Sequence, residues 1–299
     1  MKHATTSSVP RHGARGAPGN VVSLALPARR GTPASDALTE RTRRIWSAGD
    51  YDRISAGFRH GAQTFVERRA LRPGLRVLDA ACGSGNLTIP AAQSGSSVTG
   101  IDLVPSLLAS ARAWADWEGL ALDLDEGNVE ELPYADGQFD VVLSMFGVMF
   151  AARPDRVVAE LERVTRRGGQ VVLANWTRRG FMGRLLAMHA ALVPPPAEVP
   201  SPLRWADEDA LRERFDSRRW RLTTTSHTLT FHYPHTPAGT AELFRVAHGP
   251  TVRAFDALDP DRRATFAVEL AAHWSSQHRP GATFTEVEAE YLEVVAVRR

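Results

Sequence analysis

The sequence predicts an α/β fold built on a mostly parallel sheet with helices on both faces. Between residues 75 and 176, short apolar stretches alternate regularly with stretches of helical character. A glycine-rich turn at residues 81–85 follows the first apolar stretch, and the acid Asp102 ends the second. Such alternation is typical of parallel strands joined by crossover helices. The expected strands are 75–80, 97–101, 121–126, 138–146 and 169–176.

The first 70 residues divide by composition into two parts. Residues 1–35 contain basic residues and no acid, and they have few aromatic side chains, so we expect a disordered basic tail. Their composition fits either an organellar transit peptide or an unstructured extension, and we favour the extension. Residues 36–70 are expected to form a helical lid that is interrupted at Gly49–Asp50.

After residue 176, the pattern predicts an amphipathic helix at 178–192, a loop to Pro202 and a helix from Asp207 to Phe215. A strand pattern follows from Trp220 to Tyr233, and helices are expected at 238–256 and 260–278. A final strand from Phe284 to Val297 should return to the sheet. The predicted divisions are therefore 1–35 (tail), 36–70 (lid), 71–180 (core), 181–283 (region covering the substrate) and 284–299 (final strand).

Composition restricts the classes of function. The 299 residues carry a formal charge of +2, but the basic residues of the tail account for all of this excess, and the rest of the chain is slightly acidic. The rest of the chain has no arginine stripe interleaved with aromatic residues, which argues against nucleic acid as a partner. One cysteine excludes an internal disulfide framework, and no stretch is long enough to span a membrane. We expect a cytoplasmic protein without a membrane partner.

The turn between the first two strands indicates a cofactor site. Asp79 ends the first strand, Gly83 and Gly85 shape the turn, and Asp102 ends the next strand. The order strand, glycine turn, helix, strand and acid suits a cofactor that contains adenosine, whose ribose hydroxyls the second acid can bind. A dinucleotide fingerprint would have a third glycine where Thr88 stands, and Asp79 would repel a pyrophosphate while attracting a cation. S-adenosylmethionine fits, because it has an ammonium, a sulfonium and a ribose but no phosphate.

The ordered motifs of residues 42–180 resemble those of class I S-adenosylmethionine-dependent methyltransferases, especially the small-molecule branch that includes the ubiquinone-biosynthesis type. The matching segments are Val77–Asn86, Val98–Asp102, Glu126–Pro133, Phe139–Ser144 and Arg167–Leu173. One Gly-x-Gly is weak evidence, whereas five segments in the right order and spacing are specific. The resemblance implies a seven-stranded Rossmann-like sheet with a helical lid.

The cofactor site is expected to combine the turn, the two acids and the positions that the resemblance implies. The predicted cofactor-binding residues are Tyr51, Asp79, Ala81, Gly83, Gly85, Asp102, Leu103, Asn128, Val129 and Ser144. Asn128 and Val129 fall where the family contacts adenine, and Tyr51 where an aromatic side chain closes over the cofactor. Asp102 could instead cap the next helix, Asn128 could be a polar turn residue and Tyr51 could be a packing residue.

Methionine and phenylalanine cluster at two places on the expected ligand edge of the sheet. Methionine suits irregular apolar ligands, so these side chains are predicted to form the substrate wall, although plain core packing is the alternative. The predicted substrate-binding residues are Met145, Phe146, Met149, Phe181, Met182 and Met188.

Methyl transfer requires a general base only when the acceptor arrives protonated. The candidate bases are His189, His227, His232, His235 and His248. We select His189 because it shares a helix with Met182 and Met188. No metal site is expected, since His227 and His232 would point to opposite faces of a strand. Cys82 is interpreted as a small residue in a crowded turn.

These observations favour an S-adenosylmethionine-dependent methyltransferase that acts on a small, partly apolar metabolite by in-line displacement, in specialised metabolism. Ser144-Met145-Phe146-Gly147 lacks the Asn/Asp-Pro-Pro-Tyr pattern of enzymes that methylate nucleobases or glutamine. A quinone-type C-methyltransferase, a non-catalytic partner protein that binds the cofactor, and an NAD-dependent oxidoreductase remain alternatives. The sequence does not predict the oligomeric state.

Overall fold

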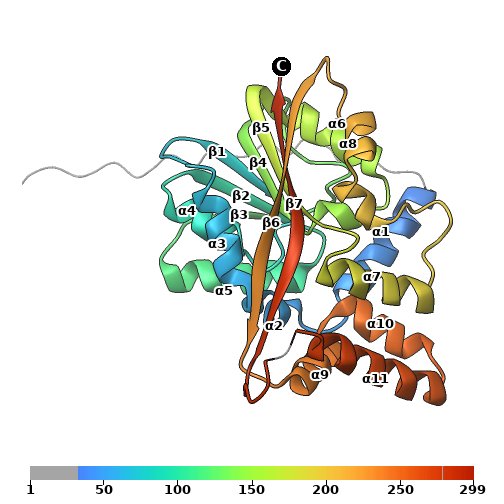
Figure 1. Cartoon of the computed structure of the whole chain (residues 1–299). Coiled ribbons are helices and arrows are strands. Elements are labelled where there is room, and N and C mark those ends of the chain that lie inside the picture. The colour runs from blue at the N-terminus through green and yellow to red at the C-terminus, as the bar shows by residue number, and fades with distance from the viewer. Residues whose placement is uncertain (1–32, 278) are drawn as a thin grey trace, which may run out of the picture.

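The computed structural model describes residues 33–277 and 279–299, and a seven-stranded sheet forms the centre of this part (Figure 1). The strand order is β3-β2-β1-β4-β5-β7-β6. β1 to β5 are parallel, whereas β7 is antiparallel to both of its neighbours. The predicted fold class is confirmed. The strands are β1 (Arg76–Ala80), β2 (Ser97–Asp102), β3 (Asp123–Glu126), β4 (Phe139–Met145), β5 (Thr165–Trp176), β6 (Trp220–Tyr233) and β7 (Thr285–Arg298).

The central strands are apolar on both faces because helices cover both sides of the sheet. Val77, Leu78, Val142 and Leu143 are fully buried. The register sets Asp79 of β1 beside Gly100 of β2 and Leu143 of β4. The carboxyl ends of these three strands therefore meet at one edge, where α/β folds hold ligands.

Helices flank the sheet on two sides (Figure 1). One side carries α3 (Arg59–Glu67), α4 (Thr88–Gln93) and α5 (Pro105–Glu118), and the other carries α1 (Pro33–Trp46), α6 (Pro154–Val164) and α7 (Phe181–Leu192). The remaining N-terminal helix is α2 (Tyr51–Ser55), followed by a 3₁₀ turn at Ala56–Phe58. Further 3₁₀ turns occur at Val148–Phe150 and Pro202–Ala206, and α8 spans Glu208–Arg214.

The described N-terminal region is helical, and its first helix starts earlier than the expected lid. The break predicted at Gly49–Asp50 separates α1 from α2. However, α1 begins at Pro33, so residues 33–35 belong to a helix and not to the predicted tail. The rest of that tail, residues 1–32, lies outside the described residues.

Three helices join β6 to β7 where two were expected. They are α9 (Pro237–Ala247), α10 (Gly249–Ala257) and α11 (Pro260–Ser275), and they gather at one end of the molecule beside α7 (Figure 1). The predicted helix at 238–256 is divided at His248, which ends α9 and precedes α10. Pro250 in the first turn of α10 has no backbone N–H for a continuing helix and disfavours helical geometry before it, so a new helix starts there.

Within residues 33–277 and 279–299, none of the helices combines the length and apolarity that a membrane crossing requires.

Candidate active site

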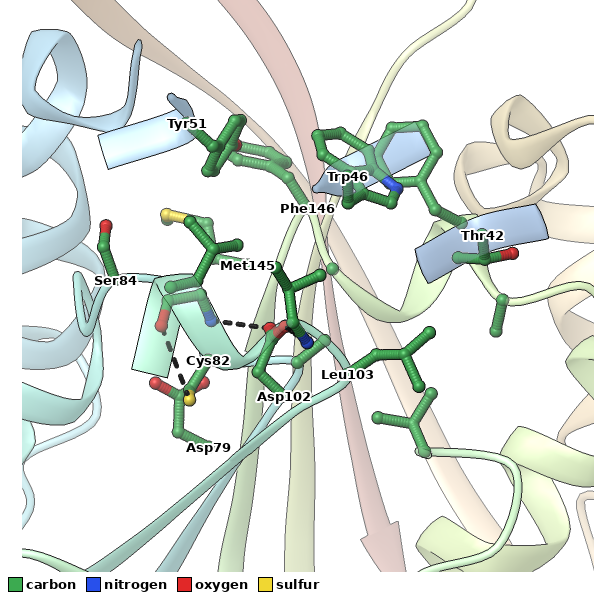
Figure 2. Close-up of a pocket in the computed structure, with 18 of the residues that line it drawn as sticks. Thr42, Trp46, Tyr51, Asp79, Cys82, Ser84, Asp102, Leu103, Met145 and Phe146 are labelled. Atoms are coloured by element: carbon green, nitrogen blue, oxygen red, sulfur yellow. Dashed lines mark hydrogen bonds between the residues drawn. The ribbon is translucent and has the colours of Figure 1, made fainter. Parts of the chain in front are cut away.

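A cavity of about 980 Å³, including its solvent-open part, lies at the carboxyl edge of β1, β2 and β4. The β1–α4 turn, the end of β2 and the segments after β3 and β4 form its floor and sides, and α1 and α2 close over it. Figure 2 shows Asp79 and Asp102 on the floor and Tyr51 and Trp46 opposite them. The cavity therefore joins the predicted glycine turn to the helical lid.

Asp79 lies at the inner end of this cavity with 1% of its surface exposed. The Thr88 hydroxyl donates a hydrogen bond of 2.6 Å to Asp79 Oδ2. Burial raises the pKa of Asp79 to about 7; the hydrogen bond from Thr88 opposes this shift, and the charge of Asp102 adds to it. Thr88, which replaces the third glycine of a dinucleotide fingerprint, thus holds a carboxylate that a bound cation would stabilise.

Asp102 is oriented by backbone N–H groups on both of its oxygens. Gly83 N donates to Oδ2 over 2.8 Å (Figure 2), and Val104 N donates to Oδ1 over 2.9 Å. Burial raises the pKa of Asp102, while these backbone donors and the charge of Arg43 oppose the rise. Each carboxylate oxygen keeps a lone pair for a ribose hydroxyl. Asp102 is not the cap of α5, because Val104 occupies the N-cap position without a side-chain cap bond.

Ala81 and Gly83 of the β1–α4 turn both have a positive φ. Gly83 has a φ of +54°, and a Cβ added there would meet no atom within 4 Å, so its missing side chain leaves space in the cavity. Ala81 also has a positive φ, of 59°, which is uncommon for a residue with a Cβ. Its methyl group is accommodated by Gly147, where an added Cβ would lie 2.6 Å from Ala81 Cβ.

The segment after β3 forms the far end of the cavity. Gly127, Asn128 and Val129 line it together with Leu103. Asn128 Nδ2 donates to Thr39 Oγ1 of α1 over 3.1 Å, and its Oδ1 accepts from Glu130 N over 3.0 Å. The Asn128 amide therefore ties the lid to this turn as well as facing the cavity, and neither of its two predicted roles excludes the other.

Aromatic side chains enclose the opposite end. The ring centroid of Trp46 lies 5.3 Å from that of Tyr51 and 4.8 Å from that of Phe150. Phe146 has a positive φ of 58° and stacks on Trp176 at 3.4 Å. Burial, followed by the charge of Asp102, raises the pKa of Tyr51, so its hydroxyl stays protonated. This enclosure would exclude water from a reacting centre.

The structure brings most of the predicted cofactor residues to this cavity, together with two of the predicted substrate residues. The lining includes Tyr51, Asp79, Ala81, Gly83, Asp102, Leu103, Asn128, Val129, Met145 and Phe146. It does not include Gly85, Ser144, Met149, Phe181, Met182, Met188 or His189.

Gly85 and Ser144 support the turn from outside the cavity. A Cβ on Gly85 would come within 3.4 Å of Ala111 Cβ, so Gly85 allows the turn to pack closely against α5. The buried Ser144 hydroxyl donates to Ala80 O over 2.7 Å and accepts from Val148 N over 3.2 Å. Ser144 therefore connects the ends of β1 and β4 without facing the cavity.

The predicted substrate residues of α7 lie outside the lining of the cofactor cavity. Phe181 is buried and stacks on His273 of α11 at 3.9 Å. Met182 lines a small cavity that shares Trp46 and Tyr51 with the cofactor cavity, and Met188 is half-buried against the core. Met149, after β4, is 1% exposed and lines a groove outside the cofactor cavity. The sequence analysis placed these side chains at the ligand edge of the sheet. It did not account for the helices α9, α10 and α11, which cover α7.

His189 belongs to a buried hydrogen-bonded chain. Its Nε2 lies 3.0 Å from Thr251 Oγ1, which lies 2.8 Å from His248 Nδ1. Burial lowers the pKa of His189 to about 4 and lowers that of His248 well below its ordinary value. His248 lines the small cavity together with Trp46 and Tyr51, both of which also line the cofactor cavity. His248 is thus the histidine beside the cofactor site, and Thr251 joins it to His189.

Sequence reasoning missed the contribution of α1. Thr39, Thr42 and Trp46 line the cavity, although only the aromatic character of Trp46 was a signal in the sequence. It also missed the contacts that hold α2 against the turn. Ser55 Oγ lies 2.9 Å from Ser84 Oγ, and Asn86 Nδ2 donates to Ser55 O over 3.0 Å.

The two acids, the glycine turn and the aromatic lid together make a cavity whose shape and charge fit a nucleoside-containing cation. A family model described as "Methyltransferase domain" matches residues 78–173. Uncharacterized protein Rv1403c of Mycobacterium tuberculosis is 38% identical over 245 residues, which cover 80% of this chain and 89% of that protein. A phosphatidylethanolamine N-methyltransferase of Cereibacter sphaeroides is 34% identical over 180 residues, which cover 59% of this chain and 83% of the enzyme.

The chain belongs to the class I S-adenosylmethionine-dependent methyltransferases. Its fold is similar to that of the YcgJ protein from Bacillus subtilis, with a TM-score of 0.55 and 14% identity over 80% of this chain and 98% of that one. The part of the chain that the structure describes contains no group of three or more His, Cys, Asp or Glu side chains suited to hold a metal ion.

Proposed function

We propose that this chain transfers the methyl group of S-adenosylmethionine to a small, partly apolar molecule by in-line displacement. The charge of the cavity lining carries this proposal. The lining side chains of the described residues include Asp79, Asp102 and Glu130 but no Arg, Lys or His. A cationic ligand is stabilised by such a lining, whereas the pyrophosphate of a dinucleotide would face two buried carboxylates.

The residues fit the parts of this cofactor. Asp79 would hold its ammonium, Asp102 its ribose hydroxyls, and Leu103 with residues 127–129 its adenine. When bound, S-adenosylmethionine supplies a methyl group on a sulfonium, and in-line attack leaves a neutral thioether. The open space at Gly83 lets the backbone approach the ligand, and the Trp46–Tyr51 pair excludes water from it. The protein thereby contributes orientation and a dry site.

An acceptor that arrives protonated needs a base, and the structure favours His248 over the predicted His189. Within the described residues, the His248 ring forms its hydrogen bond through Nδ1, with Thr251 Oγ1. If Nδ1–H donates to Thr251, Nε2 of His248 presents a lone pair that can take the acceptor's proton. His189, behind Thr251, would then fix the tautomer of His248.

Substituting both histidines tests these roles. We expect His248→Gln to lower kcat about 10²- to 10⁴-fold, as for loss of a general base, with a smaller effect of the matched His189→Gln. The difference should be largest for an acceptor with a high pKa. Equal losses in both variants, or no change in the pH profile, would contradict the assignment of His248.

Cofactor identity is tested by calorimetry with S-adenosylhomocysteine and, in parallel, with NAD. We expect saturable one-to-one binding of S-adenosylhomocysteine and no heat from NAD. Binding of NAD without binding of S-adenosylhomocysteine would overturn the proposed function. Incubation with labelled S-adenosylmethionine and a metabolite extract then tests turnover, and binding without any methyl transfer would favour a non-catalytic partner protein.

The similar proteins do not agree on one acceptor. One is the phosphatidylethanolamine N-methyltransferase, and another is a malonyl-[acyl-carrier protein] O-methyltransferase of Pectobacterium atrosepticum, 36% identical over 43% of this chain and 49% of that enzyme. A role in specialised metabolism and a cytoplasmic location are part of our proposal, as is the absence of nucleic-acid and membrane partners.

A further inference from the structure

A second cavity, here called the outer groove, lies on the other side of the lid from the glycine turn. It is about 1520 Å³ in volume, including its open part. Its walls come from α1, α7, α10, the 3₁₀ turn after β4 and the loop at 193–202. The apolar lining includes Leu38, Ile45, Met149, Leu186, Val193, Pro195, Val199, Pro200, Pro202, Pro250 and Ala254. The groove therefore suits an apolar ligand.

The ionisable side chains in the groove lining are three arginines and one histidine. Arg41 and Arg44 come from α1 and Arg253 from α10, and the lining residues include no Asp or Glu. Arg253 pairs with Asp256 at 3.3 Å and donates to Arg44 O over 3.4 Å, which holds α10 against the last turn of α1. In the described part of the chain, neither Arg41 nor Arg44 forms a side-chain ion pair. The groove therefore has an excess of positive charge.

Two aromatic rings connect the outer groove to the cofactor cavity. Trp46 and Phe150 line the cofactor cavity, the outer groove and the small cavity that contains His248. Their centroids are 4.8 Å apart with an angle of 64° between the rings. A ligand in the groove is thus separated from the cofactor cavity by these two side chains.

We propose that the outer groove binds an apolar small molecule that carries an anionic group, a carboxylate or a phosphate, at Arg41 and Arg44. The other end of this molecule reaches toward the cofactor past Trp46 and Phe150. Its identification as the methyl acceptor rests on the proposed function, whereas the binding site itself does not. The accepting atom lies at the end away from the anion, because Arg41 and Arg44 line the groove but not the cofactor cavity, whereas Trp46 and Phe150 line both.

Three ligands with one apolar chain and different charge test the proposal. Decanoate, 1-decanol and decyltrimethylammonium are titrated below their micelle concentrations into the full chain, with and without S-adenosylhomocysteine. We expect one decanoate per chain, bound roughly 2- to 30-fold more tightly than decanol, the range for two partly exposed charge pairs. The cation should bind more weakly than decanol, and the preference for decanoate should decrease with salt.

Substitutions in the groove lining test whether decanoate binds in the outer groove. Changing both Arg41 and Arg44 to Gln should remove the preference for decanoate and leave decanol binding unchanged. Arg262→Gln on α11, an exposed residue outside the groove, is the matched control. Ala190→Trp, on the exposed part of the groove wall, should weaken decanoate and decanol together.

Equal affinity for decanoate and decanol would overturn the proposal, as would unchanged binding in Ala190→Trp. Binding of S-adenosylhomocysteine is measured separately in each protein. If it fails while decanoate binds as expected, the proposed function is wrong and the groove assignment stands. If S-adenosylhomocysteine binds and decanoate does not, only the groove assignment is wrong.

Discussion

Binding of the cofactor should release a proton from Asp79. Burial raises the pKa of this carboxyl group from its ordinary value of 3.8 to about 7 in the ligand-free protein. An ammonium beside Asp79 favours the ionised form and lowers this pKa again. Below pH 7, Asp79 must lose a proton when the cofactor binds, and the observed affinity for the cofactor is therefore lower.

The change in cofactor affinity with pH follows from the pKa of Asp79. A carboxyl group with a pKa of about 7 is mostly ionised at pH 8 and about one tenth ionised at pH 6. The affinity for S-adenosylhomocysteine, which also carries the ammonium, should therefore fall about tenfold from pH 8 to pH 6 and about 90-fold by pH 5. Asp79→Asn should bind more weakly at pH 8, by roughly 10- to 150-fold, and should lose this pH dependence.

The same shift affects the stability of the ligand-free protein with the opposite dependence on pH. The folded-state pKa is raised, so the contribution of Asp79 to stability is fully present below pH 4 and is lost as the pH rises through 7. The loss is on the order of 4 kcal/mol for a shift of this size. The increase in Tm caused by S-adenosylhomocysteine should consequently be larger at pH 8 than at pH 5.5.

Calorimetry in two buffers of different ionisation enthalpy measures the released proton directly. We expect about 0.9 proton per ligand near pH 6 and about 0.1 at pH 8. Asp116→Asn on α5, an exposed carboxyl outside the cavity, is the control and should behave as the native protein. Equal heats in both buffers at pH 6, together with a flat affinity profile, would refute the assignment of Asp79 to the ammonium.

Four substitutions test other parts of the site. Asp102→Ala should weaken S-adenosylhomocysteine binding by roughly 1.5–3 kcal/mol, as for loss of a hydrogen bond to a charged group, and unchanged affinity in the folded variant would remove it from the site. Gly147→Ala would place a Cβ 2.6 Å from that of Ala81; we expect a loss of about 1–3 kcal/mol of stability and weaker cofactor binding, measured by denaturation and calorimetry. Met149→Ala should cost roughly 2–5 kcal/mol of stability because that side chain is 1% exposed, and it should also change acceptor kinetics because Met149 lines the outer groove. Met145→Ala should change acceptor kinetics with a smaller loss of stability, because Met145 is half-buried in the lining of the cofactor cavity. Thermal melting beside kinetics separates the two variants, and a larger loss of stability in Met145→Ala would contradict this reasoning.

The sequence by itself determined the sheet, the turn and the two acids. The alternation of strands and helices predicted the parallel core, because each strand and its following helix are encoded locally. Asp79, Gly83 and Asp102 could be located because they stand at the ends of strands, and the carboxyl ends of neighbouring parallel strands must meet. Thr88 indicated a cofactor without a pyrophosphate, and its hydrogen bond to Asp79 now supplies a structural reason.

Only the tertiary structure decided what surrounds those residues. Trp46 and Thr39 reach the cavity because α1 packs over it, and no local pattern specifies that placement. Phe181, although on the helix after β5, is buried against α11, which lies about 80 residues later in the chain and whose position depends on the division of α9 from α10 near Pro250. The sequence identifies apolar side chains, but whether such a side chain lines a cavity or fills a core depends on what packs against it. The packing elements here come from distant parts of the chain.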